Sequence, residues 1–409
     1  MPVFSNACLE TQLLLQCARS RIDVQTADRI KKLSSAAIDW SLLVRLGHHQ
    51  KVIPLLYQSL KSVCSETVPA IVLSQLQNRV RANTLWNLFL AKELVAVLGM
   101  LEENGIKAIP FKGPTLAMTA YGDLGLRRFG DLDILVQKQD FIKAKKLIIS
   151  QKYQLAVTDL QELLIFKHAF QSPFRHHSSR FTIDLHWGLS PKRPGRRHRF
   201  DCLWSNLGSI SLLGQSVPTL SPESTLVVQC INAVKEPADQ SLKQICDIAE
   251  VIKTYPNLSW KTAFSTAQQL GCERLFLIGL NLSHQLYGTV LPEEASQKIS
   301  SIPIVQKYTR AFEERFFQLD ANKVEESPVE RGLWGKGLDV DQSINQYAFE
   351  TTDLTDRPLY TLDKLVSPNF NDATAIPLSP SLYGLYYFIR PVRLCASLVE
   401  KRILMLKSG

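Results

Sequence analysis

The sequence predicts an α+β protein, in which a small domain of short strands and helices is embedded between N-terminal and C-terminal helical domains. Apolar residues recur at helical spacing through residues 1–104 and again beyond residue 222, whereas residues 105–190 alternate short apolar runs with polar turns. The length of 409 residues suits two or three domains, and a hydrophobic share of 45% is ordinary for a globular protein.

The first domain, residues 1–104, is expected to contain helices only. Pro69 opens a long segment with apolar residues at helical spacing that continues to Leu101. Asn104 and Gly105 follow, and both are residues preferred just past the end of a helix. No combination of residues typical of a catalytic site occurs in this domain.

The second domain, residues 105–190, begins where the helical spacing gives way to short strands with helices between them. Phe181, Ile183 and Leu185 alternate with polar residues, a pattern typical of a half-buried strand. The expected strands are Ile106–Phe111, Leu132–Val136, Tyr153–Val157 and Arg180–His186, and the expected helices are Asp140–Ser150 and Leu160–Lys167.

The third domain, residues 191–315, is expected to be helical after a linker rich in Pro and Arg, Ser190–Arg199. Pro222 lies where a first helical turn tolerates proline, and the acidic residue after it favours a helix start. The remaining residues, 316–409, form a less regular C-terminal region that ends in a basic and apolar helix, Leu394–Leu406.

The net charge of +9 favours anionic partners such as nucleotide phosphates, nucleic acid or an anionic membrane surface. Eight cysteines without a Cys-x-x-Cys pair suit free thiols in a reducing cytoplasm. The N-terminus lacks the build of a signal peptide, and no apolar run approaches the ~20 residues of a membrane span. We therefore expect a cytoplasmic protein without a transmembrane segment.

Three basic or histidine-rich features have weaker interpretations. The arginine cluster in residues 192–199 has no interleaved aromatic residues, so we expect a solvated linker and no nucleic-acid partner. The C-terminal helix can contact a membrane surface or a protein, although packing against the chain's own helices is the favoured interpretation. His168, His176, His177 and His186 match no common zinc spacing and have no cysteine partners nearby.

The most informative stretch ends in Asp131-Leu132-Asp133. Residues two apart on a strand point the same way, so Asp131 and Asp133 are expected to lie side by side on one face. Two carboxylates aimed at one point repel unless a cation lies between them, and oxygen ligands suit Mg²⁺. Asp184, at the centre of a later strand, is the candidate third ligand. The competing interpretation makes Asp131 a turn cap and Asp184 a solvated strand residue.

Residues near the acidic pair are candidates for binding an anion. Lys112 and Gly113 lie between a strand and a helix, where glycine lets backbone N–H groups approach phosphate oxygens. Arg127 lies four residues before the pair and can reach a phosphate. In the helical domain, Lys235 and Asp247 can face the same cleft. An ordinary strand-to-helix turn and an exposed helix face are the alternatives.

These motifs together resemble the uncharacterised nucleotidyltransferase family of bacteria, a branch of the DNA polymerase β-like superfamily. The resemblance covers most of the chain and rests on Lys112-Gly113, Arg127, Asp131-Leu132-Asp133, Asp184-Leu185-His186-Trp187, the Lys235 segment, Cys246–Glu250 and Leu378–Leu394. It implies a mixed sheet with flanking helices and a nucleoside triphosphate donor. It also implies two Mg²⁺ ions, or Mn²⁺ in their place, bound by Asp131, Asp133 and Asp184.

The resemblance further implies transfer of a nucleoside monophosphate, with AMP from ATP favoured, to an unidentified acceptor hydroxyl, phosphate or carboxylate. The expected setting is natural-product or surface-polysaccharide biosynthesis. Two residues depart from the superfamily pattern: Pro114 replaces the serine of its usual Gly-Ser, and Asn232 stands where a histidine often precedes the matched lysine. The competing functions are an Asp-x-Asp glycosyltransferase that uses a nucleotide-sugar and a non-catalytic nucleotide-binding regulator.

Overall fold

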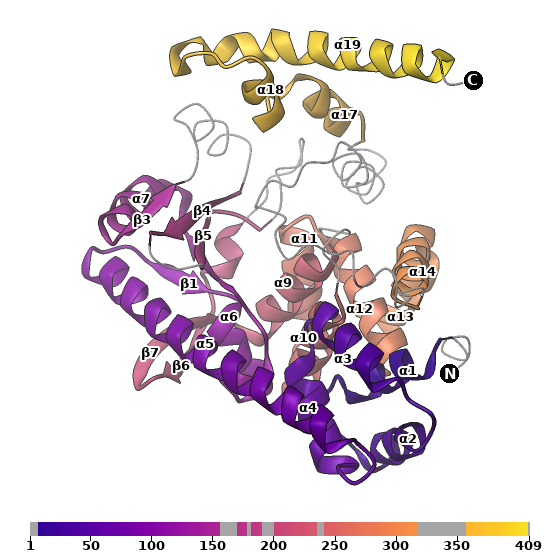
Figure 1. Cartoon of the computed structure of the whole chain (residues 1–409). Coiled ribbons are helices and arrows are strands. Elements are labelled where there is room, and N and C mark those ends of the chain that lie inside the picture. The colour runs from indigo at the N-terminus through magenta and orange to yellow at the C-terminus, as the bar shows by residue number, and fades with distance from the viewer. Residues whose placement is uncertain are drawn as a thin grey trace.

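The structure is a computed structural model in which helices surround a small central sheet (Figure 1). It describes residues 7–155, 170–177, 181–189, 200–234, 241–317 and 357–407. The expected helix Leu160–Lys167, the linker Ser190–Arg199, His168 and Lys235 lie outside these residues.

The central sheet has five strands in the order β1-β2-β5-β4-β3. β2 and β5 run parallel, and the other neighbouring pairs are antiparallel, which confirms the mixed sheet that the resemblance implied. The register sets Asp133 opposite Asp184 at the centre of the sheet. The strands are β1 (Ala108–Pro110), β2 (Asp131–Val136), β3 (Tyr153–Leu155), β4 (Gln171–His176) and β5 (Thr182–His186).

The two faces of β2 have different chemistry because successive side chains point to opposite sides. Leu132 and Ile134 belong to a core shared with α5 (Ala70–Glu103) and α7 (Phe141–Ser150), which cover that face. Asp131, Asp133 and Leu135 alternate with them and point to the opposite face. Leu135 there belongs to the core of the helical bundle. The acidic face of the sheet is therefore the face turned toward the bundle.

The 34-residue helix α5 runs along one side of the sheet (Figure 1). Leu90, Leu94 and Leu101 on it are buried in the core that contains Leu132. By length and composition alone, α5 is the one helix within the described ranges that is long and apolar enough to cross a membrane. This is weak evidence for a span, because the core helix of a soluble protein passes the same test.

The bundle combines N-terminal helices with helices from residues 222–317, and both groups share one hydrophobic core, with Leu14 and Leu56 beside Leu226 and Leu280. Its N-terminal members are α1 (Leu9–Cys17), α2 (Val24–Ser34), α3 (Trp40–His49) and α4 (Ile53–Val63). Its other members are α9 (Pro222–Val234), α10 (Leu242–Thr254), α11 (Trp260–Gln269), α12 (Glu273–Tyr287), α13 (Glu293–Ser301) and α14 (Pro303–Phe317).

Short elements complete the surroundings of the sheet. β1 leads into α6 (Gly113–Leu116), a π-helical turn (Ala117–Tyr121) and a 3₁₀ turn (Leu124–Leu126) before β2. A hairpin of β6 (Leu207–Leu212) and β7 (Gln215–Leu220), which the sequence analysis did not predict, packs its inner residues against the sheet core.

The C-terminal region forms α17 (Arg357–Val366), α18 (Phe370–Ala375) and α19 (Tyr386–Lys407), drawn together at the top of Figure 1. Ala373, Tyr383 and Tyr386 form a small core of their own. α19 contacts α17 and α18, whereas the packing of the expected helix Leu394–Leu406 against the chain's own helices remains a prediction. Phe388 and Val392 on α19 nevertheless remain exposed, at 75% and 71%.

Candidate metal and nucleotide site

The candidate site lies where β2 and β5 run side by side. Asp133 and Asp184 are cross-strand neighbours, and His186 follows two residues further along β5 on the same face. One ligand atom from each of these three residues lies within 4.8 Å of the others, and all three residues are buried. The structure thus brings Asp184 beside Asp133, although 50 residues separate them along the chain.

Asp133 is held by two neighbouring side chains, Lys112 and His186. Lys112 donates a hydrogen bond to its Oδ1 over 2.8 Å, and His186 Nε2 lies 3.2 Å from the same oxygen. Burial works against ionisation, but the Lys112 ammonium and the His186 ring outweigh it and hold the pKa of Asp133 well below its usual range. Its other oxygen, Oδ2, is buried and has no hydrogen-bond partner within the described part of the chain.

Asp131 lies at the edge of this group rather than inside it. It is half-buried, and it is not among the three residues whose ligand atoms converge. Burial, followed by repulsion from Asp133, raises the pKa of Asp131, and Lys112 opposes that rise. The converging set in the structure is therefore Asp133, Asp184 and His186, where the sequence analysis expected Asp131 in place of the histidine.

Lys112 reaches Asp133 because of the sharp turn that follows β1. Gly113 has a φ of +52°, a left-handed conformation that favours glycine, and a Cβ added to it would lie 3.5 Å from the carbonyl oxygen of Asp131. The Thr115 hydroxyl donates to the Lys112 carbonyl over 2.7 Å and closes the turn. Burial lowers the pKa of Lys112, but Asp133 and Asp131 raise it above its usual value, so Lys112 is charged.

Arg127 and Asp247 were both expected to face a nucleotide, and in the structure they bind each other. Nε and Nη2 of Arg127 donate to the two carboxylate oxygens of Asp247, each over 2.8 Å. The Tyr121 hydroxyl donates to Asp247 over 2.7 Å. Both members of the ion pair are buried. Because Arg127 lies in the loop before β2 and Asp247 lies on α10, the pair joins these two segments.

Lys243 is a residue of this region that the sequence analysis missed. It lies one helical turn before Asp247 on α10, with its Nζ 3.6 Å from Oδ2 of that residue. Burial and the neighbouring Arg127 lower the pKa of Lys243 to about 8, while Asp247 and Asp131 oppose the change. The i,i+4 spacing of Lys243 and Asp247 was the signal in the sequence.

Residues of the N-terminal helices fix this constellation. The side-chain oxygen of Gln50 accepts a hydrogen bond from the backbone N–H of Leu242, and the backbone carbonyl of Gln50 accepts one from the backbone N–H of Lys243. These two bonds anchor the first turn of α10. Asn87 on α5 donates to the carbonyls of Leu124 and Arg127. The bundle and α5 therefore set the positions of Lys243 and Arg127.

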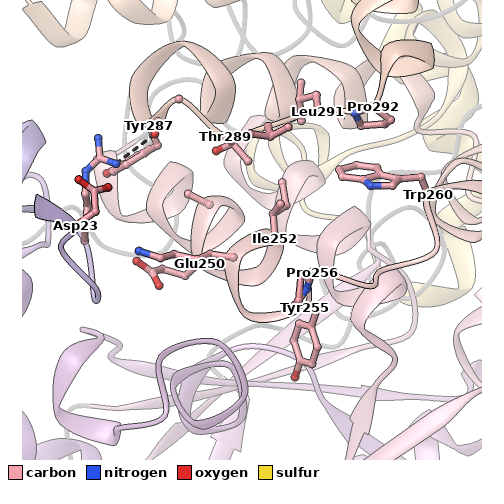
Figure 2. A pocket seen from close by; sticks show the side chains of 15 residues that line it. Asp23, Glu250, Ile252, Tyr255, Pro256, Trp260, Tyr287, Thr289, Leu291 and Pro292 are labelled. Carbon is pink, nitrogen blue, oxygen red and sulfur yellow. Dashed lines mark hydrogen bonds between the residues drawn. The ribbon is translucent and has the colours of Figure 1, made fainter. Parts of the chain in front are cut away.

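A separate cavity of about 560 Å³ lies between α10 and the segment after α12, and Figure 2 shows Glu250, Trp260, Tyr287 and Leu291 around it. None of the residues described above lines it. Its charged side chains already have partners, since Glu250 accepts from Ser20 and Lys253 donates to a backbone carbonyl. We therefore place the candidate site at the sheet and not in this cavity.

A comparison with protein families shows which family the chain belongs to. Residues 36–288, more than half of the chain, match the family model described as "Uncharacterised nucleotidyltransferase". The chain belongs to this family. The match contains every candidate site residue from Lys112 to Asp247 and confirms the uncharacterised nucleotidyltransferase family that the motifs resemble, while Leu378–Leu394 lies outside it. The protein is thus a nucleotidyltransferase with a buried Asp-Asp-His group that can hold a metal ion.

Other comparisons add little. A solved structure described as an antigenic nucleotidyltransferase-like protein from Paracoccidioides brasiliensis is 17% identical to this chain. The alignment covers 52% of this chain and 95% of that one, with a TM-score of 0.31, which is too low to support a structural argument. No curated protein matches the chain.

Proposed function

We propose that the protein transfers a nucleoside monophosphate from a nucleoside triphosphate, with ATP as the expected donor, to an acceptor hydroxyl, phosphate or carboxylate. The observation that carries the proposal is the register that sets Asp133 beside Asp184, with one buried oxygen of Asp133 lacking a hydrogen-bond partner within the described part of the chain. Buried carboxylate oxygens without a donor are costly unless a cation is bound.

The donor set fits a divalent cation. Carboxylate oxygens of Asp133 and Asp184 are the ligands that Mg²⁺ and Mn²⁺ accept, and the two side chains lie within reach of one ion. Asp131, half-buried at the edge, is the residue that we assign to a second ion, as the family resemblance implies. When bound, such ions activate the attacking oxygen and neutralise charge on the phosphates.

The basic residues of the site are assigned to the triphosphate. Lys112, at the turn with Gly113, pairs with Asp133, and on α10 Asp247 pairs with both Arg127 and Lys243. In the reaction, the acceptor oxygen forms a bond to the α-phosphorus in line with the leaving group. The bond between the α-phosphorus and the oxygen that bridges it to the β-phosphorus breaks, and pyrophosphate leaves.

Calorimetry with a panel of the four NTPs in the presence of Mg²⁺ or Mn²⁺ tests this proposal. We expect one NTP, ATP first, to bind the wild-type protein, and we expect the doubly substituted Asp133→Asn, Asp184→Asn protein to lose that binding. UDP-sugars belong in the same panel, because binding of a UDP-sugar without any NTP would favour the glycosyltransferase instead.

The acceptor and the pathway are part of the proposal. Natural-product or surface-polysaccharide biosynthesis in the cytoplasm is the setting we propose, and the eight cysteines, all free thiols, suit a reducing compartment. Incubation with ATP and extracts, followed by mass spectrometry, should reveal an acceptor whose mass has increased by one AMP unit. An unchanged cellular phenotype for Asp133→Ala would favour the non-catalytic regulator.

A further inference from the structure

His186 stands out because its imidazole is buried on the acidic face of the sheet. Only 1% of its surface is exposed, and its ring is packed edge-on against Phe111 with the ring centroids 4.9 Å apart. Phe170 lies on another side of the ring, with a centroid distance of 6.2 Å. This packing fixes the ring plane and directs Nε2 toward Asp133.

The negative charge of Asp133 does not require a histidine beside it. Asp133 already has the Lys112 ammonium 2.8 Å from Oδ1, so its negative charge is compensated without an imidazolium. A buried ring that served only to fill the core would be replaceable by an apolar side chain. A ring nitrogen set beside two carboxylates instead provides a third donor for a cation.

The distances suit a single ion. Ligand atoms about 2.0–2.2 Å from a cation lie roughly 3–4.4 Å from one another. One ligand atom each from Asp133, Asp184 and His186 lies within 4.8 Å of the others, so shifts well below the length of a side chain close the group around an ion.

We infer that Nε2 of His186 is a direct ligand of the cation, which makes Asp133, Asp184 and His186 a mixed oxygen and nitrogen site that prefers Mn²⁺ to Mg²⁺. The inference rests on the proposed function, since it specifies the cation of the same site. Imidazole binds first-row transition ions well and Mg²⁺ poorly, whereas carboxylates accept both. A neutral ring gives its Nε2 lone pair to the ion and carries its proton on Nδ1.

Pulsed electron paramagnetic resonance of Mn²⁺ bound to the full-length protein tests the inference directly. Mn²⁺ is added alone and then with a non-hydrolysable ATP analogue, to protein with ordinary or ¹⁵N-labelled histidine. We expect a hyperfine coupling from one directly bound nitrogen that changes when histidine carries ¹⁵N, which separates it from the adenine nitrogens. This readout uses the wild-type chain and does not depend on the folding of a variant.

Two variants and a control extend the test. His186→Gln should lose the nitrogen coupling and bind Mn²⁺ about 10-fold or more weakly, with a smaller loss for Mg²⁺. His186→Asp should shift the preference toward Mg²⁺. His284→Gln, which changes an exposed histidine on α12, should leave the spectrum and both affinities unchanged.

The outcomes separate this inference from the proposed function. Mn²⁺ that binds in an Asp133-dependent way without a histidine nitrogen coupling would overturn the ligand assignment and leave the nucleotidyltransferase site standing. If the wild-type chain binds neither Mn²⁺ nor Mg²⁺, with or without the ATP analogue, both proposals fail. Equal or higher affinity for Mg²⁺ would overturn the stated preference.

Discussion

The ammonium of Lys112 neutralises the charge of Asp133. Nζ lies 2.8 Å from Oδ1, and the side chain of Asp133 is 2% exposed, so water screens the pair weakly. A divalent cation at Asp133 and a lysine ammonium on the same carboxylate repel each other. The lysine therefore competes with the ion until the phosphates of a nucleotide offer it another partner.

We predict that Lys112→Met increases the affinity for Mn²⁺ about tenfold in the absence of nucleotide, because a like charge beside the ion has been removed. The same change should weaken NTP binding, since the triphosphate loses a cation. Calorimetry with the ion alone and then with ion and NTP measures both effects. Lys107→Met, at an exposed position before β1, is the matched control. An ion affinity that falls or stays the same would show that the two cations do not compete.

Lys243 allows a pH-dependent stability test. Its pKa is about 8 in the folded chain, against about 10.4 for an unperturbed lysine, so between these values the unfolded chain binds more protons. Wild-type stability should therefore rise with pH in that window, and below pH 8 the full cost of the buried charge is present.

We predict that Lys243→Met increases the free energy of unfolding by about 1–3 kcal/mol at pH 7, and that this gain shrinks as the pH approaches about 10.4. Urea unfolding at several pH values measures it. Lys253→Met, an exposed lysine on the same helix, should show no such gain. A gain that is constant with pH would mean that folding does not lower the pKa of Lys243.

Between elements, the Arg127–Asp247 pair ties the loop before β2 to α10. Four charged or polar groups meet there, because Tyr121 and Lys243 also approach Asp247. Burial of a single carboxylate without its arginine is costly, whereas burial of the complete pair is close to neutral relative to an apolar pair.

We predict that Arg127→Met destabilises the protein by about 3–5 kcal/mol, because Asp247 would remain buried without its main partner. The double change Arg127→Met, Asp247→Leu should recover most of this loss. Both proteins are compared by urea unfolding at pH 7. If the double variant were as unstable as the single one, the loss would come from packing and not from the stranded charge.

The helices and strands predicted best from the sequence are those whose apolar residues recur at regular spacing and whose ends are marked by turn or capping residues. The long helix before Asn104, the strand at Leu132–Val136 and the helix that starts near Pro222 all lie close to their predicted positions. β4 escaped prediction because Pro173 removes a backbone donor from its centre, which argues against a strand. The β6–β7 turn gave no signal, because Leu213, with a φ of +51°, stands where Asn or Gly is usual.

The candidate site was predictable where strand periodicity applies. Asp131, Asp133 and Asp184 follow from alternation on two strands, but the parallel register that makes Asp133 and Asp184 partners depends on long-range pairing. No periodic pattern in the sequence could indicate that Asp247 binds Arg127, because 119 residues separate them along the chain. Such contacts become visible only when the bundle is folded against the sheet.

For the whole molecule, the sheet with its acidic face turned to the helical bundle is the arrangement that creates the site. Residues from the N-terminal helices, the sheet and α10 all contribute to it, through Gln50, Asn87, Asp133 and Lys243. The division into residues 1–104, 105–190, 191–315 and 316–409 remains a prediction. The shared core of the first and third segments suggests that they fold together.

We predict that a chain ending at residue 317 keeps the affinity of the full-length protein for Mn²⁺ and NTP within about twofold. The family match ends at residue 288, and α17–α19 have a separate hydrophobic core, so the site does not depend on them. Calorimetry on both chains measures this, with thermal unfolding as the control for folding. A loss of binding in a folded shorter chain would assign the C-terminal region to the site.

Transfer of label from an α-³²P-labelled NTP, measured together with pyrophosphate release, tests directly whether the protein is a nucleotidyltransferase that uses Asp133 and Asp184. The assay contains Mg²⁺ or Mn²⁺ and cell extract as the source of acceptor. We predict that the wild-type protein moves the label to a new product with one pyrophosphate released per transfer, and that Asp133→Asn and Asp184→Asn abolish both signals. A wild-type protein that neither binds nor turns over any NTP, or an Asp184→Asn variant with full activity, would contradict it.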